Sequence, residues 1–247
     1  MRLKIFSNYS PNFKSIKRRT SQIKFLIFHY TGMKNEIDAI KKLTSFKSNV
    51  SCHYFIKNNG EILLMVPDLY ISWHAGKSKW KNYKSLNKHS IGIEISNPGH
   101  SFNYKQFSTK QIQSVIKLSK ILIKKYKIKP KNILGHSDVA PERKKDPGEK
   151  FPWRELAMKK IGVWHSISSE ILKNNRGIKL NKISQEKFYK NLSRIGYMSE
   201  KITNLRNKNF KNYIIKAFQR RFRQELINGK IDKECLIISE NLANKYK

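Results

Sequence analysis

The segment IKFLIFHY, residues 23–30, is a short apolar run rich in residues that favour β-strands. Side chains alternate across a strand, so Ile23, Phe25, Ile27 and His29 share one face. An apolar run of this length, followed by the polar residues Thr31 and Gly32, is typical of a buried strand. The segment therefore predicts a buried strand that ends at a histidine.

Two further strands are predicted on either side of a long helix. In residues 90–96 (SIGIEIS) the isoleucines alternate with other residues, so that Glu94 faces away from them. Residues 132–135 form a short strand that runs directly into His136. If this strand and the first one are parallel neighbours, His29 and His136 lie at the same edge of the sheet.

Helices are predicted between these strands. Apolar residues at helical spacing indicate one helix in residues 36–47 and a clearer one in residues 108–126. The second begins with Ser108 and Gln111 in the positions of a capping box. Pro152 suits the first position of a further short helix, because its missing N–H is not needed there. Strands and helices thus alternate along this part of the chain.

A hairpin completes the predicted sheet. Residues 53–57 and 61–66 are apolar runs separated by Asn58-Asn59-Gly60, and Asn-Gly is the strongest short signal for a tight turn between antiparallel strands. The parallel and antiparallel pairs together predict an α/β fold, with a central mixed β-sheet flanked by helices.

The composition and the apolar pattern of the sequence change beyond about residue 175. Residues 174–184 are polar and resemble a linker, and three apolar stripes at helical spacing follow without any strand signal. We therefore expect the sheet domain in residues 1–175, followed by a small three-helix domain in residues 180–247.

The charge of the chain is strongly positive. Its 247 residues include 52 Lys and Arg against 17 Asp and Glu, a formal net charge of +35. Such a charge favours a polyanionic partner, namely a nucleic acid, an anionic membrane surface or an acidic polymer. A coding bias toward Lys, Asn and Ile is an equally good explanation.

Other features exclude several classes of protein. The two cysteines, Cys52 and Cys235, lie far apart and predict neither a disulfide framework nor a thiolate zinc cluster. The apolar runs are far shorter than the roughly 20 residues that span a bilayer. Residues 1–20 lack the apolar core of a secretory signal, so the sequence indicates no export route.

Acidic residues are scarce but concentrated in residues 135–155, GHSDVAPERKKDPGEKFPWRE, immediately after the third strand. Five of the 17 acids lie there: Asp138, Glu142, Asp146, Glu149 and Glu155. A histidine and several acids in a loop shaped by Pro and Gly indicate a metal or acid/base site. For Asp138, Glu142 and Glu149 we prefer the alternative, in which they cap helices or pair with basic neighbours.

Several motifs carry a family resemblance. They occur in a fixed order: FHYTG (28–32), SCHYFI (51–56), SWHAG (72–76), IGIEISNPG (91–99) and GHSDVAPERKKDPGEKFPW (135–153). Over roughly residues 22–160 the chain resembles the zinc-dependent N-acetylmuramoyl-L-alanine amidases of the type 2 amidase family, which share their fold with peptidoglycan recognition proteins. Residues 217–234 are similar to a small three-helix peptidoglycan-binding domain, although Cys235 stands where a Thr is usual.

The resemblance implies roles for five residues. His29, His136 and Asp146 match the ligands of one zinc ion per chain, with the fourth position left for water, which is the arrangement of a catalytic zinc site. Glu94 matches the acid that takes a proton from water and passes it to the leaving amine. Lys144 matches the basic residue that stabilises the oxyanion.

Substrate contacts are predicted less directly. His74 is a candidate for lining the cleft, with packing as an equal alternative, and Trp73, Asn97 and Trp153 are candidates for touching sugar or peptide. We interpret the remaining histidines as satisfied structural residues; they are His53, His89, His100 and His165. Lys145 is expected to point away from the site.

The resemblance implies hydrolysis of the amide bond between N-acetylmuramic acid, or its 1,6-anhydro form, and the L-alanine of the stem peptide. The expected partners are peptidoglycan or muropeptides. The alternative is a non-catalytic peptidoglycan-binding protein on the same fold. Specific nucleic-acid binding rests on charge alone and has no motif to support it. The wall-binding-like tail favours the cell envelope or secretion, and the missing signal favours the cytoplasm; the oligomeric state is left open.

Overall fold

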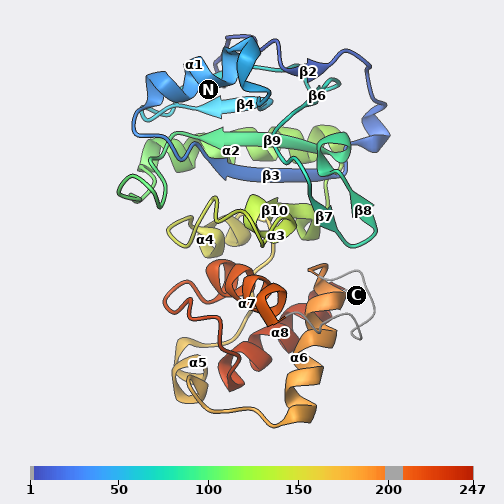
Figure 1. The fold of residues 1–247 in the computed structure, drawn as a ribbon, viewed down its shortest axis with the longest axis vertical. Helices are drawn as coiled ribbons and strands as arrows, with labels where there is room; N and C mark the ends of the chain where they lie inside the picture. The colour runs from blue at the N-terminus through green and yellow to red at the C-terminus, as the bar shows by residue number, and fades with distance from the viewer. Residues whose placement is uncertain (1–2, 198–207, 247) are drawn as a thin grey trace.

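The structure, a computed structural model, describes residues 3–197 and 208–246. Six strands of this part form one mixed sheet in the order β1-β5-β4-β9-β3-β10 (Figure 1). Their bounds are β1 (Ile5–Ser7), β3 (Phe25–Tyr30), β4 (Tyr54–Ile56), β5 (Ile62–Leu64), β9 (Ser90–Ile95) and β10 (Ile133–Gly135). The strands β4, β9, β3 and β10 run parallel, whereas β4 and β5 form the antiparallel hairpin. This confirms the predicted mixed sheet.

Four strands of two residues each make two small antiparallel pairs at the margin of the sheet. They are β2 (Phe13–Lys14) with β6 (Ile71–Ser72), and β7 (Lys79–Trp80) with β8 (Tyr83–Lys84). The sequence did not predict these pairs, because two residues are too few to display an alternating pattern.

The α-helices that the structure describes are α1 (Glu36–Thr44), α2 (Thr109–Tyr126), α3 (His136–Val139), α4 (Trp153–Met158), α5 (Ser169–Asn175), α6 (Lys182–Ile195), α7 (Lys208–Phe222) and α8 (Lys233–Lys245). Ser108 and Gln111 form the predicted capping box of α2. Helix α1 ends at Thr44, three residues earlier than predicted, and the backbone of the next residue, Ser45, is extended. Among the described helices, none combines the length and the apolar composition needed to cross a membrane.

The two faces of the sheet are covered differently. The isoleucines of β9 pack with α2 and α4 in one core, on the face that α2 covers. On the other face, α1 packs over Phe55 of β4, while α6, α7 and α8 pack near Phe25 and Ile27 of β3. Figure 1 shows α5–α8 gathered at one end of the molecule, beside β10 and α3. The middle of this second face is therefore framed by helices on both sides.

The segment predicted as a linker, residues 174–184, is fixed in place. Its first residues end α5, which packs against α8, and its last residues begin α6. Between them, the guanidinium of Arg176 donates to Glu234 at 2.8 Å. Residues 176–181 connect α5 to α6, and the side chain of Arg176 in this predicted linker has a partner nearly 60 residues away. Residues 198–207 of the predicted C-terminal domain lie outside the described residues.

A buried ion pair joins the helical end to the sheet. Arg221 of α7 is 1% exposed and pairs with Asp138 of α3. Its guanidinium also donates to the carbonyl oxygen of Ile133 at 2.8 Å and lies 4.2 Å above the ring of Trp153. The Asp138 carboxylate accepts in addition from Gly135 N, at 2.8 Å, as expected for a helix-capping acid. The helix that begins with His136 is thus held by both parts of the chain.

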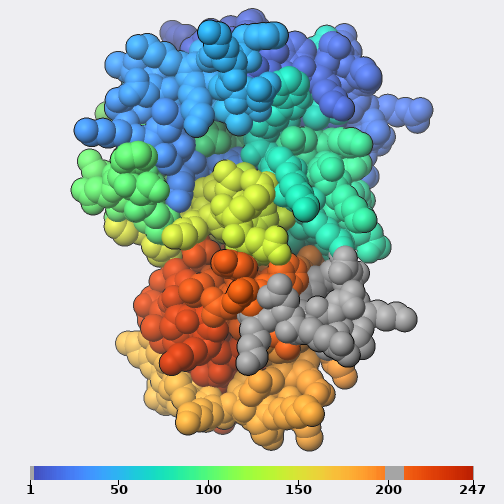
Figure 2. Space-filling model, viewed as in Figure 1, coloured from blue at the N-terminus to red at the C-terminus, as the bar shows by residue number. Residues whose placement is uncertain are grey.

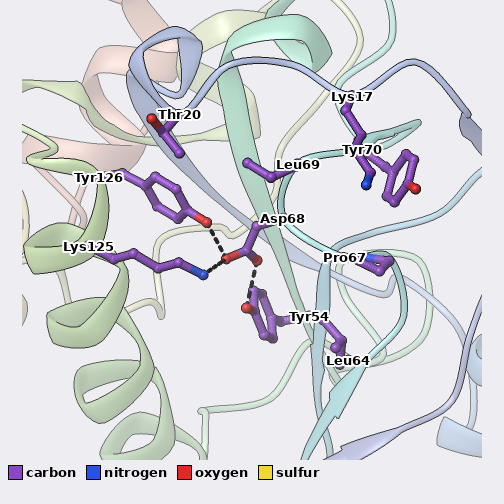
Figure 3. A pocket seen from close by; sticks show the side chains of 10 residues that line it. All are labelled: Lys17, Thr20, Tyr54, Leu64, Pro67, Asp68, Leu69, Tyr70, Lys125 and Tyr126. Atoms are coloured by element: carbon purple, nitrogen blue, oxygen red, sulfur yellow. Dashed lines mark hydrogen bonds and ion pairs between the residues drawn. The ribbon is translucent and has the colours of Figure 1, made fainter.

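A second buried acid, Asp68, lies beside β4 and the last residue of α2, in the pocket of Figure 3. The carboxylate of Asp68 accepts from Tyr54 Oη at 2.6 Å, from Tyr126 Oη at 2.5 Å and from Lys125 Nζ at 2.8 Å. Burial raises the pKa of Asp68, but these three donors outweigh burial and leave that pKa below its usual value. Asp68 therefore ties α2 to the hairpin as a charged, fully bonded group.

Candidate active site

A row of side chains lies on the second face of the sheet, between α1 and the C-terminal helices. In the parallel register of β3 and β9, His29 lies opposite Glu94. Gly135, at the end of β10, lies opposite Phe28, so the next residue, His136, follows at the level of His29. The strand register therefore brings the two histidines to the same edge, as the sequence predicted, and places Glu94 beside them.

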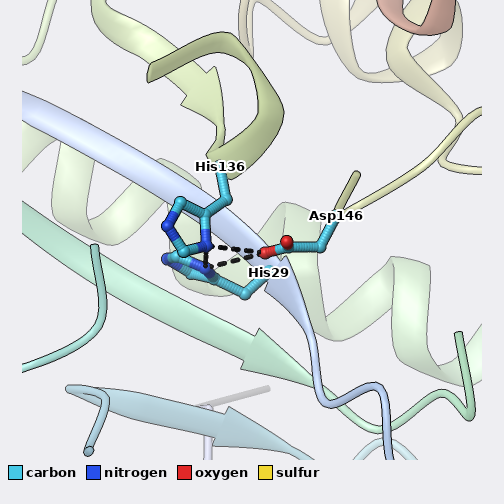
Figure 4. A group of neighbouring side chains, drawn as sticks. All are labelled: His29, His136 and Asp146. Carbon is cyan, nitrogen blue, oxygen red and sulfur yellow. Dashed lines mark hydrogen bonds and ion pairs between the residues drawn. The ribbon is translucent and has the colours of Figure 1, made fainter. Parts of the chain in front are cut away.

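Asp146 completes a buried cluster with the two histidines (Figure 4). Its Oδ2 lies 3.0 Å from His29 Nδ1 and 3.0 Å from His136 Nδ1, and the two Nδ1 atoms are 2.9 Å apart. All three residues are at most 5% exposed. The loop that carries Asp146 is held against α3 by a hydrogen bond of 2.8 Å from Ser137 N to the Asp146 carbonyl oxygen.

The donor set suits a metal ion. Two imidazole nitrogens and one carboxylate oxygen converge from three different elements, and this combination is typical of zinc sites with an open fourth position. His136 Nε2 lies 3.1 Å from the carbonyl oxygen of Ala75, which only accepts, so this nitrogen carries the ring proton. The Nδ1 lone pair of His136 consequently points into the cluster.

The electrostatics of the site follow from burial and from mutual proximity. Burial, and then the neighbouring His136, lower the pKa of His29 to about 4, although Asp146 acts in the opposite direction. Burial alone raises the pKa of Asp146, but His136 and His29 outweigh it and hold that pKa well below its usual range. Burial, and then the charge of Asp146, raise the pKa of the Glu94 carboxyl well above its usual value.

The cluster lies in a cleft of about 470 Å³. In Figure 2 the yellow segment that follows β10 lies between the blue part around α1 and the red and orange helices. The charged side chains that line the cleft are Lys42, Glu94, Arg143, Lys144, Lys145 and Asp146. Basic groups outnumber acidic ones, so the cleft favours a ligand with negative charge. Lys145 was expected to point elsewhere, yet it contributes to the lining as well.

Some of the residues predicted to contact substrate line the cleft, and others are buried in the core. Trp73 and His74 line the cleft, and His74 Nδ1 lies 3.0 Å from His29 Nε2. Burial, and then the charge of His29, lower the pKa of His74 well below its usual value. Asn97 is 3% exposed, and its amide donates to the Lys105 carbonyl oxygen. Trp153 is 2% exposed and packs in the core under Arg221, so neither Asn97 nor Trp153 is part of the lining.

Other lining residues were missed by the sequence analysis. His100 was interpreted as structural, but it lines the cleft, where its Nδ1 lies 2.8 Å from Tyr30 Oη and its Nε2 3.1 Å from Glu149. The only signal in the sequence was its position just after Gly99, whose φ of +66° turns the chain beyond the strand that holds Glu94. Arg143 joins the lining from the acid-rich loop, with its guanidinium on the Lys77 carbonyl oxygen at 2.8 Å.

Comparison with known proteins connects this site to a family. A sequence profile described as N-acetylmuramoyl-L-alanine amidase matches residues 19–149, which include His29, Glu94, His136 and Asp146. The N-acetylmuramoyl-L-alanine amidase AmiD from Escherichia coli is 35% identical over 237 residues, covering 91% of this chain and 84% of AmiD. The 1,6-anhydro-N-acetylmuramyl-L-alanine amidase AmpD from E. coli is 38% identical over 104 residues, covering 42% of this chain and 55% of AmpD.

Solved structures extend the similarity to the C-terminal helices. E. coli AmiD, in complex with its substrate anhydro-N-acetylmuramic acid-L-Ala-D-gamma-Glu-L-Lys, has a TM-score of 0.79 at 34% identity and covers 94% of this chain and 93% of its own. AMPDH3 from Pseudomonas aeruginosa, in complex with anhydromuramic pentapeptide, has a TM-score of 0.79 at 28% identity, with coverage of 96% and 97%. By profile, by identity over most of its length and by fold, the chain belongs to the N-acetylmuramoyl-L-alanine amidase family of hydrolases.

Proposed function

We propose that this chain hydrolyses the amide bond between N-acetylmuramic acid, or its 1,6-anhydro form, and the L-alanine of the stem peptide, with one zinc ion held by His29, His136 and Asp146. The observation that carries this proposal is the convergence of two imidazole nitrogens and a carboxylate oxygen beside Glu94 in a basic cleft. The complexes of AmiD with its substrate and of AMPDH3 with anhydromuramic pentapeptide support the same class of ligand.

A bound zinc ion would supply Lewis acidity, which polarises a carbonyl group and makes water more acidic. The protein contributes the rest of the chemistry. Glu94 faces the same cleft as the cluster, so its carboxylate accepts the proton of the attacking water and then delivers it to the nitrogen of the leaving L-alanine. The pKa of Glu94, raised by burial, favours a carboxyl group that holds this proton between the two steps.

Lys144 has a separate role in the proposal. It lines the cleft two residues before Asp146, and its ammonium group stabilises the negative oxygen that develops when water adds to the carbonyl. The other basic residues of the lining suit the free carboxylates of a stem peptide. Muropeptides or the intact wall polymer are accordingly the proposed partners, and no specific nucleic acid is proposed.

The test is mass spectrometry of the products. The zinc-loaded protein is incubated with anhydro-muropeptides and with intact sacculi, alongside a Glu94→Gln variant whose zinc content is measured. We expect free stem peptide from the wild type and a rate at least about 100-fold lower from the variant. Zinc-loaded wild type that binds muropeptides but leaves them intact would identify the chain as a non-catalytic binding protein instead.

For the C-terminal part, residues 180–247, we propose a peptidoglycan-binding role, carried by the exposed surface of its helices. The side chains of Ile183 on α6 and Tyr213 on α7 are exposed and available for contact. The test uses the full chain with Glu94→Gln, so that the polymer stays intact, and measures sedimentation with sacculi. Ile183→Ser and Tyr213→Ser in that background should weaken binding, and equal sedimentation of all three proteins would contradict the proposal.

A further inference from the structure

A chain of three hydrogen bonds runs from the backbone to the metal cluster. It begins at Ser90, whose Oγ lies 2.6 Å from the carbonyl oxygen of Leu86. A carbonyl oxygen only accepts, so the Ser90 hydroxyl donates its single hydrogen there. The lone pairs of Ser90 Oγ therefore remain for another donor.

That donor is His74, whose Nε2 lies 3.1 Å from Ser90 Oγ. A neutral imidazole that carries its proton on Nε2 has a lone pair on Nδ1. His74 Nδ1 lies 3.0 Å from His29 Nε2, so His29 must donate in this contact. The Nδ1 of His29 is then left with its lone pair, which faces Asp146 and His136.

The two histidines of the cluster thus reach the same tautomer by different routes. His136 donates from Nε2 to a backbone carbonyl, that of Ala75, at 3.1 Å. His29 donates to a side chain, and its tautomer depends on the identity of residue 74. A substitution can therefore remove the acceptor of His29 but leave that of His136 intact.

The His74 ring packs directly against the backbone of Gly92. A Cβ atom built on Gly92 would lie 2.4 Å from His74 Cγ, so the imidazole occupies the space that any larger residue would fill. The ring meets that of His29 edge to face, with 5.1 Å between centroids. The His74 backbone N–H is also fixed, by Asn87 Oδ1 at 3.2 Å. The neighbours of this ring therefore determine its position, its orientation and which of its nitrogens carries the proton.

We propose that His74 is a positioning residue that holds His29 in the tautomer whose Nδ1 lone pair faces the metal, with Ser90 and Gly92 holding His74 in turn. This inference rests on the proposed function, in which His29 is a zinc ligand. Partners of this kind orient metal-binding histidines in many proteins, and their loss typically weakens metal affinity about 10- to 100-fold.

The experiment measures zinc affinity of the full chain, stripped of metal and titrated in competition with a chromophoric chelator. His74→Leu should bind zinc about 10- to 100-fold more weakly than wild type. His74→Asn should stay within about threefold, because its Oδ1 takes the place of Nδ1 as an acceptor. The matched control is His165→Leu, the same substitution at a buried histidine outside the site, which should leave the affinity unchanged.

A second readout is the visible absorption spectrum of the cobalt-substituted protein. The ligand-field bands should shift in His74→Leu and be restored in His74→Asn. Gly92→Ala, which displaces the His74 ring without touching any cluster residue, should shift them as His74→Leu does. If His74→Leu does not fold, Ser90→Ala tests the same chain, and we expect it to weaken zinc binding about threefold or more.

The outcomes separate this inference from the proposed function. Wild type that fails to bind zinc overturns both. Tight zinc binding by wild type together with equal affinity in His74→Leu overturns the positioning role alone, and so does Ser90→Ala with wild-type affinity if His74→Leu is unfolded. Equal losses in His74→Leu and His74→Asn also overturn it, because the ring would then act by packing and not by accepting a hydrogen bond.

Discussion

Removing the guanidinium of Arg221 should destabilise the whole protein, and the size of the loss can be worked out from its contacts. In Arg221→Met the buried carboxylate of Asp138 loses its cationic partner, and the carbonyl oxygen of Ile133 loses a donor. Methionine fills most of the space above Trp153 but carries no charge. The loss of stability in Arg221→Met should therefore be mainly electrostatic.

The expected magnitude follows from the carboxylate that stays behind. Removing one partner of a buried ion pair costs about 3–5 kcal/mol, because the remaining charge is left uncompensated. Asp138 keeps two donors, Gly135 N at 2.8 Å and Tyr197 Oη at 2.6 Å, which place the expectation near the lower end, at about 3 kcal/mol. With a urea m-value of about 3 kcal/mol/M, the unfolding midpoint should fall by about 1 M.

Urea unfolding followed by circular dichroism measures this loss, with Arg154→Met as the matched control. Arg154 is exposed, so its substitution should change the free energy of unfolding by no more than about 0.5 kcal/mol. Adding Asp138→Asn to Arg221→Met removes the stranded charge and should recover at least about 1 kcal/mol. A loss below about 1 kcal/mol in Arg221→Met, or no recovery in the double variant, would refute the electrostatic reasoning.

Three further predictions concern the site and the response to pH. Lys144→Met should lower kcat about 100-fold or more with little change in KM, as steady-state kinetics on a muropeptide will test. Burial lowers the pKa of His165 to about 4, whereas an unfolded histidine takes up a proton near pH 6.5. The unfolded state therefore gains stability relative to the folded state as the pH falls from 6.5 toward 4, and the protein loses stability over that range. Between pH 7 and pH 4, the free energy of unfolding measured with urea should fall by about 3 kcal/mol less in His165→Gln than in wild type. If free zinc is 100-fold above its Kd, removing it with a chelator should lower the free energy of unfolding of wild type by about 3 kcal/mol. The same treatment should leave the free energy of unfolding of Asp146→Ala unchanged.

Local features of the fold could be predicted because their causes are local in the sequence. The capping box of α2 needs only Ser108 and Gln111, three residues apart, and the hairpin of β4 and β5 needs only its Asn-Gly turn. The alternation in β9 was enough to place Glu94 on the face opposite the isoleucines. Each of these patterns lies within a few residues, where covalent geometry limits the choices.

The helical end shows where local reasoning fails. In the sequence, Arg220, Arg221 and Arg223 form part of a large positive charge that suggests a solvated, anion-binding surface. In the structure all three are at most 8% exposed. Arg221 pairs with an acid 83 residues away, and no periodicity reveals such a partner. Part of the positive charge from which a polyanionic ligand was predicted is therefore structural.

The sequence by itself determined the types of the main elements and which residues are candidates for the site, because motifs state residue identity and spacing directly. Only the tertiary structure decided what those residues touch. It brought His29, His136 and Asp146 together through strand register and a loop, made Trp153 a core residue, and turned His74 toward His29. The physical reason is that the order of parallel strands and the pairing of buried polar groups depend on contacts between distant segments, which a local pattern does not encode.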